Sequence, residues 1–196
     1  MAQTPSTMLP LGTKAPDFEL PDADGRLVRL DDFSDARALL VAFICNHCPF
    51  VVHIEREFAR LASDYSARGA AVVAITSNDT EKYPQDGPGG MREQIRRAGF
   101  TFDYLLDEFQ EVAKAYQAAC TPDFFLFDAG RRLVYRGQFD GSRPGNDVPV
   151  TGKDLRTALD TVLAGDEPAN DQRPSIGCNI KWKPGNEPDW WNTVHS

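Results

Sequence analysis

The hydrophobic positions along the chain change their period between residues 38 and 61, and the other predicted elements are arranged around that change. Residues 38–44 form an unbroken apolar run, which is typical of a strand that is buried on both faces. After this run, apolar residues recur at the spacing of one helix face, at Val51, Ile54, Phe58 and Leu61. The stretch therefore predicts a buried strand that leads directly into an amphipathic helix.

Two cysteines, Cys45 and Cys48, lie at this junction, and Pro49 follows the second of them. Proline suits the first position of a helix, because the N–H that it lacks would have no partner there. A helix beginning after Cys45 would instead place Pro49 where a hydrogen bond is needed. Unpaired amides and the helix dipole stabilise a thiolate at a helix start. Cys48 is therefore the predicted nucleophile, with Pro49 as the first helical residue.

Alternation, helical spacing and breaker residues predict the remaining elements. The expected elements are a hairpin over 16–20 and 26–30, a second buried strand at 70–75, a long loop at 76–90, a helix at 91–98, a short strand at 104–106, a helix at 107–119 with Phe109 on its apolar face, a third apolar strand at 124–127, an edge strand at 133–137 and a last helix ending at Gly165. Strands that alternate with helices predict an α/β sandwich with a mixed central sheet covered on both faces.

The two ends differ from the middle of the chain. Residues 1–11 show little apolar periodicity and are predicted to be a flexible arm, followed by one domain over 12–165. Residues 166–196 contain four prolines, two glycines and all three tryptophans. This composition predicts an extended tail that its aromatic side chains hold against the domain.

Charge and cysteine content narrow the possible function. The 196 residues include 29 acidic and 21 basic side chains, which give a net charge of −8 without any Lys/Arg run. Nucleic acid and acidic membrane surfaces are therefore not expected as partners. The N-terminus lacks the features of a signal peptide, and no apolar run is long enough to span a bilayer. We expect a cytoplasmic protein, in which a close cysteine pair is usually catalytic or metal-binding.

The order of elements resembles the thioredoxin fold: a strand ending at a cysteine–helix junction, Thr121-Pro122 before a buried strand, then a hairpin and a closing helix. Residues 12–20 and the turn that follows them resemble AhpC/TSA-type peroxiredoxins and the TlpA and ResA group of thiol–disulfide reductases. The resemblance implies a thioredoxin-like three-layer sandwich without a bound organic cofactor. It also implies a cis Pro122 that shapes the binding groove, beside a Thr121 backbone free to pair with a substrate strand.

The sequence departs from both family patterns at informative positions. Cys48 aligns with the first cysteine of thioredoxin, whereas Val51 stands at the place of the second, and Ala42 replaces a buried acid. Cys48 also matches the peroxidatic cysteine of peroxiredoxins, but Cys45 replaces their threonine and Val41 a proline. These departures favour thiol–disulfide exchange slightly over peroxide reduction.

In this interpretation the Cys48 thiolate attacks a protein or small-molecule disulfide or a peroxide, and Cys45 resolves the adduct. His47, when protonated, would further favour the thiolate, and a cellular dithiol would supply electrons. Cys178 is either a distant resolving cysteine or a packing residue of the tail. Cys120 is either an additional redox residue or a small buried side chain.

Two other classes of function stay open. A metal site could draw on Cys45, Cys48 and His53 with Cys120 or Cys178, although no second cysteine pair with this spacing exists. His53 is otherwise expected to be a partly exposed helix residue, and His195 to be solvated. The other class is a binding module that kept the fold without catalysis.

Overall fold

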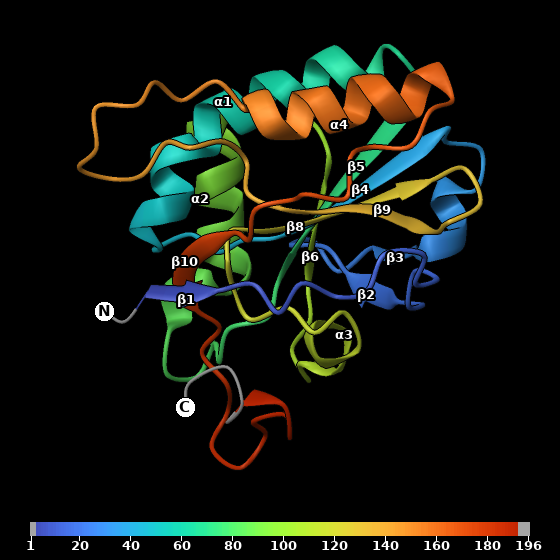
Figure 1. Cartoon of the computed structure of the whole chain (residues 1–196). Coiled ribbons are helices and arrows are strands. Elements are labelled where there is room, and N and C mark those ends of the chain that lie inside the picture. The colour runs from blue at the N-terminus through green and yellow to red at the C-terminus, as the bar shows by residue number, and fades with distance from the viewer. Residues whose placement is uncertain (1–2, 192–196) are drawn as a thin grey trace.

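A five-stranded mixed sheet forms the centre of the protein, which is described over residues 3–191 by a computed structural model (Figure 1). Strand β4 (Ala38–Phe43) lies in the middle and runs parallel to β5 (Ala70–Thr76), which in turn is parallel to β6 (Asp103–Leu106). On its other side β4 pairs antiparallel with β8 (Asp123–Asp128), and β9 (Leu133–Gly137) forms the edge. The expected mixed sheet is confirmed.

Three helices cover one face of this sheet (Figure 1). They are α1 (Pro49–Ser66), α2 (Pro88–Ala98) and α4 (Lys153–Ala164). Leu40 and Ala42 of β4 point into the core beneath them. The ring of Phe58 lies near the middle of this core, between 5.1 and 6.3 Å from four other phenylalanine rings.

The opposite face is covered by a hairpin and a short helix. These elements are β2 (Glu19–Pro21), β3 (Leu27–Arg29) and α3 (Glu111–Ala115), with the single-turn helix η1 (Leu30–Phe33) next to the hairpin. Leu39, Val41 and Phe43 of β4 point to this second core. Every residue of β4 is therefore buried, because its alternate side chains serve two cores, as the unbroken apolar run predicted.

Helix α1 begins at Pro49, in the predicted register. Cys48 precedes it with an extended backbone (φ −70°, ψ 122°). The four predicted apolar side chains of its inner face, Val51, Ile54, Phe58 and Leu61, are all buried. The proline argument therefore identified the start of the helix correctly.

The helix expected over residues 107–119 is much shorter in the structure, because α3 spans only Glu111–Ala115. Gln110 precedes it with a left-handed backbone (φ 64°), which interrupts the helix. The Asp107 carboxylate accepts the amide of Ala113 at 2.8 Å and so caps the short helix from outside. Phe109 is 74% exposed, and its predicted place on a buried face was wrong.

The loop expected over residues 76–90 is also shorter than predicted. Pro84 begins the single-turn helix η2 (Pro84–Asp86), and Pro88 begins α2. Proline is well suited to the first position of a helix, so residues that signalled a loop instead start two helices.

The two ends of the described chain form a second, small sheet. Strand β1 (Gln3–Pro5) pairs with β10 (Ile176–Asn179), which pairs in turn with β7 (Cys120–Thr121). The expectation of a flexible arm is wrong for the described part of residues 1–11, since Thr4 is fully buried and Leu9 is 4% exposed. The partner strand lies near the other end of the chain, where a local pattern cannot indicate it.

Beyond β10 the tail is irregular and contains hydrogen-bonded turns over residues 183–186 and 188–191. Its three tryptophan rings contact one another with centroids 6.0 to 6.2 Å apart. The expected solvation of His195 concerns a residue outside the described range. No helix within residues 3–191 combines the length and the apolar composition needed to cross a membrane.

Candidate active site

The Cys48 thiol lies fully buried at the start of α1, facing the peptide bond between Thr121 and Pro122. That peptide bond is cis, as the resemblance implied. As a thiol, Cys48 donates a hydrogen bond to the carbonyl oxygen of Thr121 at 3.1 Å. The structure therefore brings the predicted nucleophile against the predicted groove residues.

Cys45 follows β4 and lies next to the same residues. Its sulfur is 3.5 Å from the hydroxyl oxygen of Thr121, and it also hydrogen-bonds Cys48. The side chain is 1% exposed. The predicted pair is thus in contact, with both sulfurs turned to Thr121.

Cys178 joins this pair from the tail. It lies on β10 directly opposite Thr121 in the antiparallel pairing of β10 with β7. Its thiol hydrogen-bonds Cys48. Three thiols from distant parts of the chain therefore meet at one place, and all four cysteines are present as free thiols.

The surroundings of the three sulfurs favour ionisation of Cys48. Hydrogen bonds from the thiols of Cys178 and then Cys45 lower the pKa of Cys48 well below its ordinary value, against the effect of burial. The same contact with Cys48, together with burial, raises the pKa of Cys178 and that of Cys45. Of the three neighbouring thiols, Cys48 is therefore the one that loses its proton most readily.

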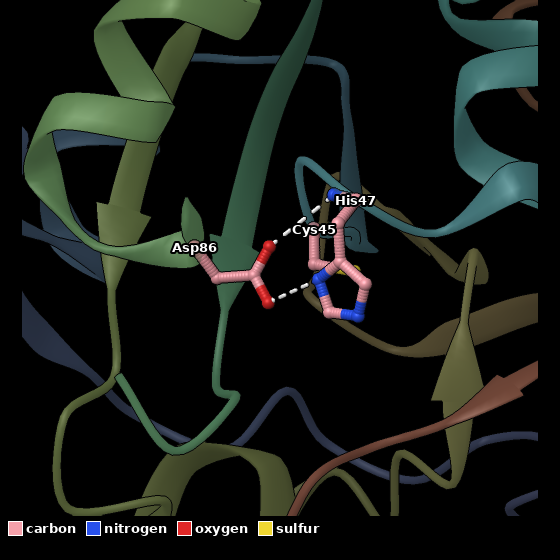
Figure 2. A group of neighbouring side chains, drawn as sticks. All are labelled: Cys45, His47 and Asp86. Atoms are coloured by element: carbon pink, nitrogen blue, oxygen red, sulfur yellow. Dashed lines mark hydrogen bonds and ion pairs between the residues drawn. The ribbon is translucent and has the colours of Figure 1, made fainter. Parts of the chain in front are cut away.

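His47 is held by a buried carboxylate (Figure 2). Its Nδ1 lies 2.6 Å from Oδ2 of Asp86, a residue without any solvent exposure, and its backbone N–H donates to Oδ1 at 3.3 Å. The Asp86 carboxylate raises the pKa of His47. The imidazole also stacks on the ring of Tyr83, with centroids 5.5 Å apart. His47 is therefore a fixed, readily protonated group next to Cys48.

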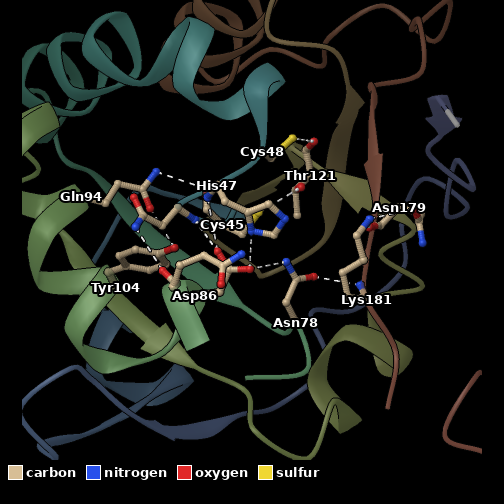
Figure 3. A network of polar contacts seen from close by, with 12 residues as sticks. Cys45, His47, Cys48, Asn78, Asp86, Gln94, Tyr104, Thr121, Asn179 and Lys181 are labelled. Carbon is tan, nitrogen blue, oxygen red and sulfur yellow. Dashed lines mark hydrogen bonds and ion pairs between the residues drawn. The ribbon is translucent and has the colours of Figure 1, made fainter. Parts of the chain in front are cut away.

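Asp86 and Asn78 belong to this site, although the sequence did not single them out. Asp86 also accepts the backbone N–H of Asn46 at 3.0 Å and the side-chain amide of Asn78 at 2.9 Å (Figure 3). Asn78 in turn accepts the backbone N–H of Lys181 in the tail at 2.8 Å. The breaker-rich loop around these residues was their only signal, since polar residues in loops carry no indication of burial.

A further buried amide supports the loop from below. Gln94 of α2 donates to the carbonyl oxygen of Cys45 at 3.3 Å, and the Tyr104 hydroxyl donates to the amide oxygen of Gln94 at 3.0 Å (Figure 3). Gln94 lies on α2 and Tyr104 on β6. They fix the backbone of Cys45 through contacts that the sequence pattern did not reveal.

The metal set considered from the sequence is not assembled. His53 interacts with another residue instead, since its Nε2 lies 2.7 Å from the hydroxyl of Ser142. A different group, Cys45, His47 and Asp86, places one donor atom each within 4.8 Å of the others (Figure 2). The Asp86 carboxylate already accepts hydrogen bonds from protein groups, so the three residues are explained as part of a polar network within the protein.

Cys120 occupies β7, adjacent to Thr121, and is fully buried. Its thiol donates to the carbonyl oxygen of Pro122 at 3.6 Å. Burial, and then the Asp123 carboxyl, raise the pKa of Cys120 well above its ordinary value. In this conformation it is a packed thiol next to the site.

Comparison with known proteins gives consistent matches. Residues 11–136 match the AhpC/TSA family. A protein of Mycobacterium tuberculosis named as a candidate peroxiredoxin is 33% identical over 116 residues, which are 59% of this chain and 68% of the relative. The thiol-disulfide oxidoreductase ResA of Geobacillus thermodenitrificans is 28% identical over 135 residues, 66% of this chain and 70% of the relative. A hypothetical protein from Sinorhizobium meliloti, solved by crystallography, is 55% identical with a TM-score of 0.91, over 93% of this chain and 100% of that one.

Proposed function

The chain belongs to the AhpC/TSA family and is a thiol-dependent oxidoreductase, and on this premise we propose that it carries out thiol–disulfide exchange with Cys48 as the attacking sulfur and Cys45 as the resolving one. The observation that carries the proposal is the position of Cys48 at the start of α1, where its sulfur lies 3.1 Å from the carbonyl oxygen of Thr121 in the cis peptide segment. The neighbouring thiols of Cys178 and Cys45 lower its pKa and so favour the thiolate. A thiolate is the form of cysteine that attacks sulfur.

The reaction proceeds in two steps. The Cys48 thiolate attacks one sulfur of a substrate disulfide, whose S–S bond breaks and whose second sulfur leaves and takes up a proton. Cys45 then gives up its proton and attacks the Cys48 sulfur, which releases the other substrate thiol and leaves a Cys45–Cys48 disulfide. A dithiol reductant restores both thiols and is itself oxidised to a disulfide. Two electrons pass from the reductant to the substrate.

His47 and Thr121 are the supporting groups in this cycle. The Asp86 carboxylate favours a protonated His47, whose positive charge lies close enough to interact with the Cys48 thiolate. Thr121 places its hydroxyl at Cys45 and its carbonyl oxygen at Cys48, so that it aligns the two sulfurs. Pro122 follows in the cis form and shapes the edge that Thr121 presents.

Peroxide reduction is the second candidate, and one observation favours it. Cys48 has no solvent exposure in this conformation, and a strand of the tail lies over Thr121. A peroxide is much smaller than a protein disulfide and needs less movement of the tail to reach the sulfur. The thiolate would then become a sulfenic acid, which a neighbouring thiol condenses to a disulfide with loss of water.

Cysteine variants test the proposal with an aromatic disulfide that releases a coloured thiolate. We expect the double variant Cys45→Ser/Cys178→Ser to hold the mixed disulfide on Cys48, detected by mass, because both neighbouring sulfurs that could release it are gone. We expect Cys48→Ser to form no such adduct at the site and to lose turnover with dithiothreitol as the reductant. Cys120→Ser, which removes a packed thiol, is the matched control. Turnover that survives in Cys48→Ser would refute the assignment.

A further inference from the structure

The backbone edge of Thr121 next to Cys48 is occupied by the chain itself. Strand β10 pairs antiparallel with β7, so that Cys178 lies opposite Thr121 and Asn179 lies opposite Cys120. An extended substrate that adds as a strand at this site would use the same edge, because it needs the backbone groups of Thr121 with which β10 pairs. β10 therefore takes the position of a bound substrate strand, and Cys178 takes the position of its reactive cysteine.

Gly177 makes this close approach possible. A Cβ atom at this position would lie 2.0 Å from the carbonyl oxygen of Thr121 and 3.2 Å from the nitrogen of Pro122. Any side chain would push β10 away from the cis-proline segment. Glycine is thus the residue type at position 177 that lets β10 approach Thr121 this closely.

Both ends of β10 are anchored. On the N-terminal side, the Ser6 amide donates to the Ser175 carbonyl oxygen at 2.9 Å, and the Ser175 amide donates to the Ser6 hydroxyl at 3.0 Å. On the C-terminal side, the Lys181 carbonyl accepts the amide of Asp79 at 2.8 Å and the side-chain amide of Gln110 at 2.9 Å. The strand is therefore held in register rather than resting loosely on the surface.

The C-terminal anchor also connects to the loop that carries the cysteines (Figure 3). Asn78 accepts the Lys181 amide and donates to Asp86, and Asp86 binds His47. A change in the position of the tail therefore acts on the same polar network that holds His47 beside Cys48.

We propose that β10 is an internal occupant of the substrate-strand position and that Cys178 resolves Cys48 whenever Cys48 is oxidised with β10 in place. The inference rests on the proposed role of Cys48. A hydroperoxide oxidises the Cys48 thiolate to a sulfenic acid and leaves as the alcohol or water. The Cys178 thiol then attacks the Cys48 sulfur, its proton and the sulfenic hydroxyl leave as water, and a Cys48–Cys178 disulfide forms. A dithiol reductant returns both thiols.

The two resolving thiols then serve different substrates. A small hydroperoxide reaches Cys48 with the tail docked, and Cys178 completes the reaction. A disulfide within an extended peptide must displace β10 to bind at Thr121, which carries Cys178 away and leaves Cys45 to resolve the adduct. The Cys48–Cys178 disulfide also fastens the tail across the groove and so excludes peptide substrates until it is reduced.

Disulfide mapping of the full chain tests the inference. The reduced protein is treated with one equivalent of hydrogen peroxide, alkylated and digested, and the linked peptides are identified by mass. We expect the Cys48–Cys178 link as the main product. In Cys178→Ser we expect this link to be replaced by Cys45–Cys48 or by over-oxidised Cys48, whereas Cys45→Ser should still give Cys48–Cys178.

Gly177→Ala provides a test that leaves all cysteines in place. The added methyl should lift β10, turn Cys48–Cys178 from the main into the minor product, and raise the rate with a peptide disulfide. Gly89→Ala is the matched control, because a Cβ at this exposed position meets no atom within 4 Å. A change of the same size in both variants would speak against a specific role of the β10 contact.

The possible failures are distinguishable. If wild-type protein forms Cys45–Cys48 and leaves Cys178 free, the inference is overturned while the role of Cys48 stands. If peroxide and disulfides leave Cys48 unmodified, the proposed function itself fails.

Discussion

The buried carboxylate of Asp86 binds His47 twice, through the imidazole Nδ1 at 2.6 Å and through the backbone N–H at 3.3 Å. The two residues lie on separate segments, the loop before α1 and the helix η2. Their contact fixes the conformation of the residues between Cys45 and Cys48. The geometry of the cysteine pair therefore depends on a residue outside the motif.

Replacing His47 by alanine should destabilise the protein, because it leaves the Asp86 carboxylate buried without its cationic partner. We expect a loss of about 1–3 kcal/mol in the free energy of unfolding. This loss is smaller than that for breaking a fully buried ion pair, because the His47 side chain is 22% exposed. Urea denaturation measures the difference. The double variant His47→Ala/Asp86→Asn should recover part of the loss, and failure to recover any would contradict a direct interaction.

The same pair predicts a pH dependence. The pKa of His47 is raised in the folded protein, so the ion pair stabilises fully below the ordinary histidine value of about 6.5. This stabilisation is lost as the pH rises through the raised pKa, where the folded protein also releases the proton. The difference in unfolding free energy between wild type and His47→Ala should therefore shrink with rising pH. A difference that stays constant across this range would disprove the charged pair.

Ultraviolet absorbance of the thiolate should identify Cys48 as the acidic thiol without any need for a reagent to reach it. A free cysteine has a pKa of about 8.5. Because neighbouring thiols lower the pKa of Cys48, its thiolate signal should persist well below that pH. Cys48→Ser should remove the signal at neutral pH, and Cys178→Ser should move its midpoint upward. Cys120→Ser is the control, and an unchanged spectrum in Cys48→Ser would exclude this assignment.

Asp123 should make the protein less stable as the pH rises. Burial raises the pKa of this fully buried carboxyl from 3.8 to about 8. Between these values the folded protein keeps a proton that the unfolded chain releases, so the free energy of unfolding falls with pH. The contribution of one such group is at most about 1.4 kcal/mol per pH unit.

Urea titrations at several pH values test this in Asp123→Asn, which cannot titrate and should therefore show a shallower decline. Asp166→Asn removes an exposed carboxyl from the same chain and serves as the control. Parallel stability curves for wild type and Asp123→Asn would rule out the predicted linkage.

Glu55 should matter more to stability than its place among charged helix residues suggests. It is 4% exposed and forms a two-point contact with Arg97, with both N–O distances at 2.8 Å. We expect Glu55→Gln to cost about 1–3 kcal/mol, because the contact joins α1 to α2 through charge-assisted bonds. Glu93 is the matched control: it lies 3.8 Å from Arg97 with its side chain 63% exposed, and Glu93→Gln should cost less than about 1 kcal/mol. Equal effects in thermal or urea unfolding would contradict the importance of burial here.

Local patterns in the sequence determined the centre of this protein. The apolar run of β4, the proline at the start of α1 and the helical spacing after it are properties of neighbouring residues, and they identified Cys48 as the helix-start thiol. They failed at α3, where the left-handed backbone of Gln110 interrupts a favourable helical pattern and the Asp107 carboxylate caps the shortened helix.

The surroundings of Cys48 were decided by the tertiary structure alone. Cys178 reaches it because the tail crosses the molecule and pairs with β7, and Asp86 reaches His47 because η2 folds against the loop before α1. Hydrophobic spacing records which face of an element is buried, whereas it carries no information on which distant strand or carboxylate will lie against that element. The sequence alone thus determined which thiol lies at the start of α1, and the folded chain determined which sulfur and which charged residues lie next to it.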